Sequence, residues 1–82
     1  MITEFQRKVY GEVKKIKKGE TKSYLEIAKK LKTSPRAVAR ALSRNYDQKV
    51  PCHRVIYSNG ELGGYNRGIR KKRKLLKKER AI

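Results

Sequence analysis

The sequence predicts a small, mainly α domain of the winged helix-turn-helix kind, with about four helices and a short β-hairpin. Apolar residues recur at helical spacing in separate stretches, and a break of three residues divides the second stretch from the third. Asn59-Gly60, a typical hairpin turn, follows a short strand-like segment. We expect residues 1–82 to form one domain with a small core, because the chain has only 82 residues.

The first helix is predicted to begin after Thr3. Gln6 stands three residues later and completes a capping-box pattern, and Gly19 is a natural end. Lysines gather towards that end, where they suit the negative pole of the helix dipole. We interpret this helix as structural, with a core face of Phe5, Val9, Val13 and Ile16.

Ser23 and Glu26 form a second capping-box pattern, which predicts the start of the second helix. Its inward face shows the spacing i, i+3, i+4, i+7 in Tyr24, Ile27, Ala28 and Leu31. Ser34-Pro35 then supplies a cap followed by proline at the first helical position, where its missing N–H costs nothing.

The third helix, about residues 35–44, has two distinct faces. Val38, Ala41 and Leu42 can pack inward, whereas Arg36, Arg40 and Arg44 project as one stripe. Together with the second helix this resembles a helix-turn-helix, although a solvated charged face on an ordinary helix pair remains the alternative. The exposed alanines cannot read base edges, so the helix favours close approach to the DNA backbone over sequence readout.

The second half of the chain predicts a loop, a hairpin and a last helix. A loop over residues 45–49 leads to Val50-Pro51, and residues 54–57 have strand character. Asn59-Gly60 turns the chain back towards residues 61–62, which would form a small wing. After the flexible turn at residues 63–66, a basic helix or frayed tail runs from residue 69 to about residue 79.

The net charge of +17, from 24 basic and seven acidic residues, predicts a polyanionic partner. Nucleic acid is preferred over an anionic membrane surface, and a lysine-rich heat-adapted surface would carry more glutamate. No stretch is apolar enough to span a bilayer. The single cysteine indicates a reducing, intracellular and cytoplasmic setting, and one Cys with one His falls short of a zinc site. We expect no cofactor and no metal.

Cys52 and His53 are the only cysteine and histidine of the chain, and they follow Pro51. A thiol has a pKa near ~8.5, so a nucleophilic cysteine needs a base or positive surroundings. The alternatives are a buried structural cysteine and a protease-like pair. Adjacent side chains on a strand point to opposite sides, so direct contact would need a turn at the proline or a bridging water.

The run Pro51-Cys52-His53-Arg54-Val55 resembles the C-terminal domain of the alkylguanine-DNA alkyltransferases, the methylated-DNA–protein-cysteine methyltransferases of direct repair. The resemblance extends from about Phe5 to Glu79. It is carried further by residues 19–24 (GETKSY), 36–38 (RAV), Asn45, 63–65 (GGY) and the spacing Lys72…Leu75-Leu76…Glu79. It implies the DNA-binding, active-site domain of that family.

The resemblance implies that Cys52 accepts an alkyl group from the 6-oxygen of guanine, once per molecule. His53 would act as the base through a water and would be oriented by Glu79. Asn45 would brace the active-site turn. These roles imply a methylated-DNA–protein-cysteine S-methyltransferase that inactivates itself.

The same resemblance implies recognition of double-stranded DNA through the minor groove. Arg36 would fill the stack left by the flipped base, and Tyr24 would press the flanking phosphate and donate to the guanine. The pocket would be shaped by the Val55 main chain with Tyr65 and Asn66. Further DNA contacts are expected at Thr21, Ser23, Ala37 and Arg40.

Two features set the chain apart from full-length relatives. The full-length relatives carry an N-terminal domain that is absent from these 82 residues. In addition, Arg67 stands where the family has the first glycine of a pair. We expect a monomer bound to DNA containing alkylated guanine. The alternative is an alkyltransferase-like protein that flags the lesion for excision repair, although such proteins generally lack the cysteine. A generic helix-turn-helix regulator would leave Cys52, His53 and Glu79 unexplained.

Overall fold

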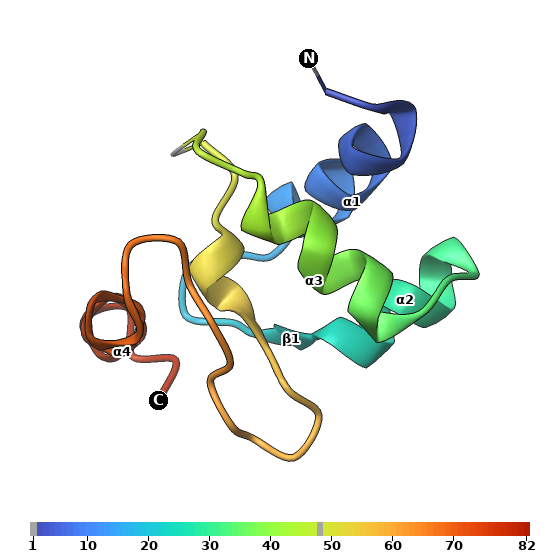
Figure 1. Ribbon diagram of the computed structural model, residues 1–82. Coiled ribbons are helices and arrows are strands. Elements are labelled where there is room, and N and C mark those ends of the chain that lie inside the picture. The colour runs from blue at the N-terminus through green and yellow to red at the C-terminus, as the bar shows by residue number, and fades with distance from the viewer. Residues whose placement is uncertain (1, 48) are drawn as a thin grey trace.

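The computed structural model describes residues 2–47 and 49–82, and Figure 1 shows how their elements are arranged. The elements in chain order are α1 (Glu4–Lys14), β1 (Lys22–Ser23), α2 (Tyr24–Leu31), α3 (Pro35–Ser43), the 3₁₀ turn Cys52–Arg54, β2 (Val55–Ile56) and α4 (Ile69–Lys78). Helices α1, α2 and α3 pack on one another. Helix α4 lies on the other side of the 3₁₀ turn from α3 (Figure 1). Residues 2–47 and 49–82 contain four α-helices, so the predicted mainly α class is confirmed.

The first three helices begin where their caps predict. The Thr3 and Ser23 hydroxyls accept from the backbone N–H of Gln6 and Glu26 at 3.1 and 2.9 Å. The side chains of these two residues accept in return from the cap N–H groups, which completes both capping boxes. Ser34 accepts from the N–H of Ala37 at 3.1 Å, ahead of α3. These bonds satisfy donors that a helix start leaves free.

Helix α1 ends earlier than predicted, at Lys14 instead of near Gly19. The chain continues through tighter turns, in which the N–H of Ile16 donates to the carbonyl of Val13 at 3.0 Å. Gly19 has φ +90° and lies against α4, where a Cβ would meet the carbonyl oxygen of Glu79 at 3.2 Å. The glycine therefore ends this turn and allows close approach to the end of α4.

The core lies between the first three helices and the residues on either side of the 3₁₀ turn. Phe5, predicted on the core face of the first helix, is instead 36% exposed. The core side chains are Val9, Tyr10, Val13, Ile16, Tyr24, Ile27, Ala28, Val38, Ala41, Leu42, Val50 and Val55. The Tyr10 hydroxyl donates to the carbonyl of Ala41 at 2.7 Å, which ties α1 to α3 within this core.

The predicted β-hairpin is wrong in its pairing. The β2 residues Val55 and Ile56 pair in parallel with Lys22 and Ser23 of β1, not with the chain after Asn59-Gly60. The turn itself closes, because the N–H of Tyr57 donates to the carbonyl of Glu61 at 2.8 Å. No return strand follows within the described residues 61–82. The strand takes a distant partner, and this parallel pairing joins the active-site turn to the start of α2.

The predicted loop over residues 45–49 is irregular at its described positions, and position 48 lies outside the described residues. Across residues 2–47 and 49–82, no helix has the length and apolar content needed to cross a membrane. The same residues contain no group of three or more His, Cys, Asp or Glu side chains that could hold a metal ion.

Candidate active site and DNA-binding face

Cys52 begins the 3₁₀ turn directly after Pro51, and its N–H donates to the carbonyl of Val50 at 2.8 Å. A 3₁₀ helix has about three residues per turn, so successive side chains diverge by roughly 120°. The thiol and the imidazole of His53 therefore leave the chain in different directions. The half-buried Cys52 borders two cavities, and His53 is buried on the side of α4.

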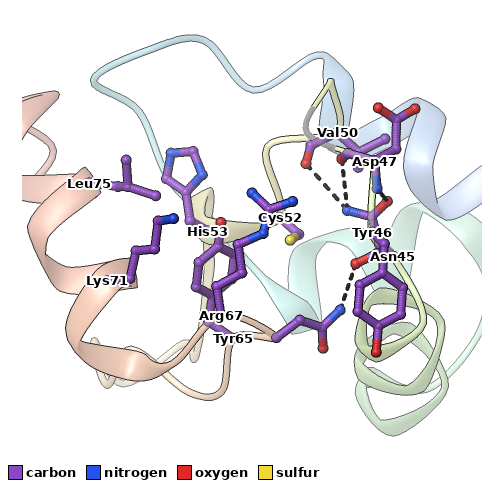
Figure 2. A pocket seen from close by; sticks show the side chains of 11 residues that line it. Asn45, Tyr46, Asp47, Val50, Cys52, His53, Tyr65, Arg67, Lys71 and Leu75 are labelled. Atoms are coloured by element: carbon purple, nitrogen blue, oxygen red, sulfur yellow. Dashed lines mark hydrogen bonds between the residues drawn. The ribbon is translucent and has the colours of Figure 1, made fainter.

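The two cavities meet at Cys52, Tyr65 and Asn66. One, of about 360 Å³, lies between α3 and the tyrosines of the following loop; its lining includes Tyr24, Leu42, Tyr57 and Tyr65. The other, of about 240 Å³, extends towards α4 and is lined by His53, Asn45, Arg67 and Lys71 among others (Figure 2). The residue that carries the thiol therefore borders both cavities.

His53 and Glu79 form a close pair, with 3.0 Å between Nε2 and Oε2. The Arg54 guanidinium, followed by the His53 contact, lowers the pKa of Glu79 to about 2. An ionised carboxylate only accepts hydrogen bonds, so Nε2 of His53 must carry the proton that it donates. In a neutral imidazole with this tautomer, Nδ1 is the nitrogen with a free lone pair. The predicted orienting contact from Glu79 is present, and its catalytic role stays a prediction.

Arg54 was expected only as a positive charge near the thiol, and its contact with Glu79 was not predicted from the sequence. Its Nε donates to Oε1 of Glu79 at 3.0 Å and its Nη2 donates to Oε2 at 2.9 Å. Its Nη1 donates to the carbonyl of Ile16 at 2.9 Å. One guanidinium therefore fixes the end of α4 to the turn after α1. The available signal was a basic residue beside the Cys-His pair, together with a lone glutamate in a basic helix.

Asn45 is buried and organises the loop before the cysteine. Its Oδ1 accepts from the N–H of Asp47 at 3.1 Å, and its Nδ2 donates to the carbonyl of Val50 at 3.4 Å. Nδ2 of Asn66 donates to the Asn45 carbonyl at 2.6 Å, which joins the end of α3 to the turn that carries Tyr65. The contacts are those of a bracing residue.

Tyr24 lies at the start of α2 and is 6% exposed. Burial, followed by the nearby Tyr57 and Cys52, raises the pKa of its hydroxyl to about 12. The ring lies 5.2 Å from that of Tyr57, measured between centroids. A hydroxyl with so high a pKa stays protonated at neutral pH and remains available as a hydrogen-bond donor at the cavity wall.

Lys72 is a second residue whose role was not anticipated. It is fully buried, and its Nζ donates to the carbonyls of Val55 at 2.6 Å and Gly64 at 3.1 Å. Burial lowers the pKa of this amine to about 8, although both carbonyls favour the charged form. Lys72 thereby holds β2 to the loop over Tyr24. Its position four residues before buried Leu76, on the inward face of α4, was the sequence signal.

Gly63 lets this loop pass close to the tyrosines. Its φ is +72°, and a Cβ there would meet Cε2 of Tyr57 at 3.1 Å and Cε2 of Tyr24 at 3.2 Å. Any larger residue would be strained in this backbone conformation and would press on both rings. The glycine therefore sets how near the loop lies to the cavity.

The predicted DNA contacts fall into two groups. Arg36, Arg40 and Arg44 are exposed at α3, and with the half-buried Ala37 they line a cleft beside the start of α1. Thr21 precedes β1 and Ser23 is the cap of α2, and neither lines a cavity that contains Cys52. Ser23 is only 6% exposed and its oxygen caps α2.

Val55 is also absent from the walls of both cavities beside Cys52. Its side chain is fully buried and its carbonyl accepts from Lys72. Val55 therefore supports the pocket from behind. Its predicted main-chain contact with a base, like the DNA contacts of Thr21 and Ser23, stays a prediction.

Comparison with known proteins places this arrangement in a family. The profile of the 6-O-methylguanine DNA methyltransferase, DNA binding domain, matches residues 4–81. A methylated-DNA–protein-cysteine methyltransferase of Methanocaldococcus vulcanius is 57% identical over 79 residues, which are 95% of this chain and 48% of the relative. The chain therefore spans about half the length of such curated relatives.

Solved structures give the same result. The Mycobacterium tuberculosis OGT in complex with DNA superimposes with a TM-score of 0.90 at 44% identity, over 96% of this chain and 51% of that one. The S. pombe Atl1 in complex with damaged DNA containing O6-carboxymethylguanine superimposes with a TM-score of 0.82 at 32% identity, over 93% of this chain and 75% of that one. The chain belongs to the family of 6-O-methylguanine DNA methyltransferase DNA-binding domains.

Proposed function

We propose that this chain repairs DNA by transferring an alkyl group, typically methyl, from the 6-oxygen of guanine to Cys52. The observation that carries the proposal is the position of the thiol, between a cavity suited to a base and the paired His53 and Glu79. The volume of about 360 Å³ lies within the range of small-molecule pockets. Each molecule acts once, because the thioether that forms is stable.

The transfer is an in-line displacement at the alkyl carbon. A bond forms between that carbon and Sγ of Cys52, while the bond from the carbon to the guanine 6-oxygen breaks and its electrons stay on the base. The thiol proton passes through one water to Nδ1 of His53, which Glu79 holds in the required tautomer. The guanine regains a proton from solvent, so charge balances. Tyr24 donates a hydrogen bond to the departing base.

The target base must leave the duplex before it can reach Cys52. Exposed Arg36, near the start of α3, is suited to enter the stack that the base vacates. Insertion from the minor groove costs a few kcal/mol of unstacking, which phosphate contacts offset. The net charge of +17 supplies such contacts and predicts a steep salt dependence of binding. The partner is double-stranded DNA containing alkylated guanine, and the protein acts where that DNA lies, inside the cell.

The decisive experiment is the mass of the peptide that contains Cys52 after incubation with duplex DNA bearing methylguanine. We expect the mass of one methyl group to be added in stoichiometric yield and with a single turnover. Cys52→Ser should bind the same duplex and gain no methyl group. Tight binding of the lesion by the unaltered protein, with no added mass, would exclude the transfer.

The second candidate is lesion binding without transfer. The likeness to S. pombe Atl1, determined with damaged DNA and matched over 75% of its chain, favours it. Cys52, set beside a carboxylate-bound histidine, favours transfer. The same mass measurement separates the two functions, because a sensor would hold alkylated DNA and leave both the lesion and Cys52 unchanged.

A further inference from the structure

Helix α4 carries five basic side chains on its outward side, which we call the α4 basic face. Its members are all exposed: Arg70, Arg73, Lys74, Lys77 and Lys78. The opposite side of the helix is buried through Lys72 and Leu76. A helix of 10 residues is about 15 Å long, so five cations lie within the span of a few phosphates of duplex DNA.

The charge on the α4 basic face is not neutralised within the described part of the chain. None of its five residues is in an ion pair there. The one carboxylate of the segment, Glu79, is already held by Arg54 and His53. Like charges four residues apart, such as Arg70 and Lys74, destabilise a helix by a few tenths of a kcal/mol per pair. A bound polyanion would remove this repulsion.

The α4 basic face is separate from the arginines of α3. The 3₁₀ turn that carries Cys52 lies between the two helices, and α4 is held by that turn (Figure 1). A duplex docked on α3 for base flipping would therefore contact the α3 arginines, and the α4 basic face would remain a second group of cations. The proposed transfer chemistry uses none of the five residues.

We propose that the α4 basic face binds the phosphate backbone of a second segment of duplex DNA, so that one protein molecule holds two segments at once. An anionic membrane fits this face less well. A helix that lies in a membrane surface buries a row of apolar side chains there. In α4, Leu76 is buried and Leu75 is half-buried, and the exposed apolar residue Ile69 stands alone at the start of the helix. The inference takes duplex DNA as the polyanion from the proposed function and depends on no other part of it.

The test is a bridging experiment in which one duplex is fixed to beads and a second, labelled duplex is captured through the protein. The variant Arg70→Gln/Arg73→Gln/Lys74→Gln removes three cations with a good helix former and keeps the lysines of the last turn. A matched control, Lys8→Gln/Lys17→Gln/Lys18→Gln, removes three exposed cations elsewhere. Circular dichroism must show equal helix content in all three proteins.

We expect the unaltered protein and the control to capture the second duplex. The α4 variant should capture at least ten-fold less of the labelled duplex. The slope of log K against log salt should become shallower by up to about 2.7 in the α4 variant, because each phosphate contact contributes roughly 0.9. Equal losses in the variant and the control would overturn the proposal, since they would show only an effect of net charge. Unchanged capture would also overturn it, as would tighter binding to vesicles of anionic lipid than to duplex DNA.

Failure of this inference and failure of the proposed function are distinguishable. Methyl transfer to Cys52 from free methylguanine needs no DNA, so the α4 variant should perform it at the rate of the unaltered protein. Capture of two duplexes without any methyl transfer would support the α4 basic face and contradict the transferase. Methyl transfer to Cys52 without capture of a second duplex would support the transferase and contradict the inference about the α4 basic face.

Discussion

Arg54 binds both carboxylate oxygens of Glu79, at 3.0 Å from Nε to Oε1 and 2.9 Å from Nη2 to Oε2. The second of these oxygens also contacts Nε2 of His53. The carboxylate is therefore fixed in position and kept ionised by the arginine, and it in turn fixes the histidine. The proposed base is therefore set up by a residue that lines neither of the cavities beside Cys52.

Glu79→Gln should slow methyl transfer by about 10²-fold or more, the usual contribution of general base catalysis. The amide cannot attract the Nε2 proton as an anion does, so the tautomer with a free Nδ1 is no longer favoured. Single-turnover kinetics with methylated duplex measure this rate. The exposed Glu20→Gln is the charge-matched control and should leave it unchanged. If both variants transfer at the original rate, Glu79 has no part in the relay.

Arg54→Lys keeps the charge but loses the two-pronged contact, so we expect a smaller fall in the transfer rate and looser docking of α4. The pKa of Glu79 is about 2, below the usual value of 4.5. Its contribution to stability is present above about pH 4.5 and is lost as the pH falls towards 2. In urea titrations over that window, Arg54→Lys should lose less stability on acidification than the unaltered protein does.

Lys72 predicts a stability change in the same direction but in an alkaline window. Its pKa is about 8 in the fold against 10.5 as a free side chain, so between these values the unfolded chain binds more protons. The free energy of unfolding should therefore rise with pH, by about 2 kcal/mol between pH 8 and 10 relative to Lys72→Met. Urea denaturation of both proteins at several pH values measures the difference. A constant difference would show that the amine keeps its proton in the fold.

Gly63→Ala should destabilise the protein and weaken binding of the base, because φ is +72° and the new methyl would press on Tyr24 and Tyr57. Gly64→Ala is the matched control, since a Cβ there has nothing within 4 Å. We expect Gly63→Ala to lower the free energy of unfolding by about 1 kcal/mol or more, which is the usual cost of a strained backbone position. Gly64→Ala should change it little. Thermal unfolding and transfer from free methylguanine test both variants.

Arg36→Ala should impair repair of duplex DNA far more than reaction with free methylguanine, since only the duplex has a stack to fill. Arg40→Ala, one turn further along the same face of α3, should weaken duplex binding through charge alone. The ratio of the two transfer rates, on duplex and on free base, is the quantity to compare. A similar ratio in both variants would remove the special role of Arg36.

Local patterns predicted the helices well because the signals that start a helix act over three residues. Thr3 with Gln6, Ser23 with Glu26, and Ser34 before Pro35 are each visible in a window of four letters, and each is present as a hydrogen-bonded cap. The prediction of the hairpin pairing was wrong because it also relied on a short window of sequence. Asn59-Gly60 correctly predicted a turn, but the partner of a strand is chosen over the whole chain.

The sequence by itself determined the class of the domain, the starts of its first three helices, its net charge of +17 and the adjacency of Cys52 and His53. Only the tertiary structure decided that Arg54 joins Glu79 and the carbonyl of Ile16, which are 25 and 38 residues away. It also decided which lysine of a basic helix is buried. Such contacts depend on which surfaces are left facing each other after the chain has closed its loops, and no local window of sequence contains that information.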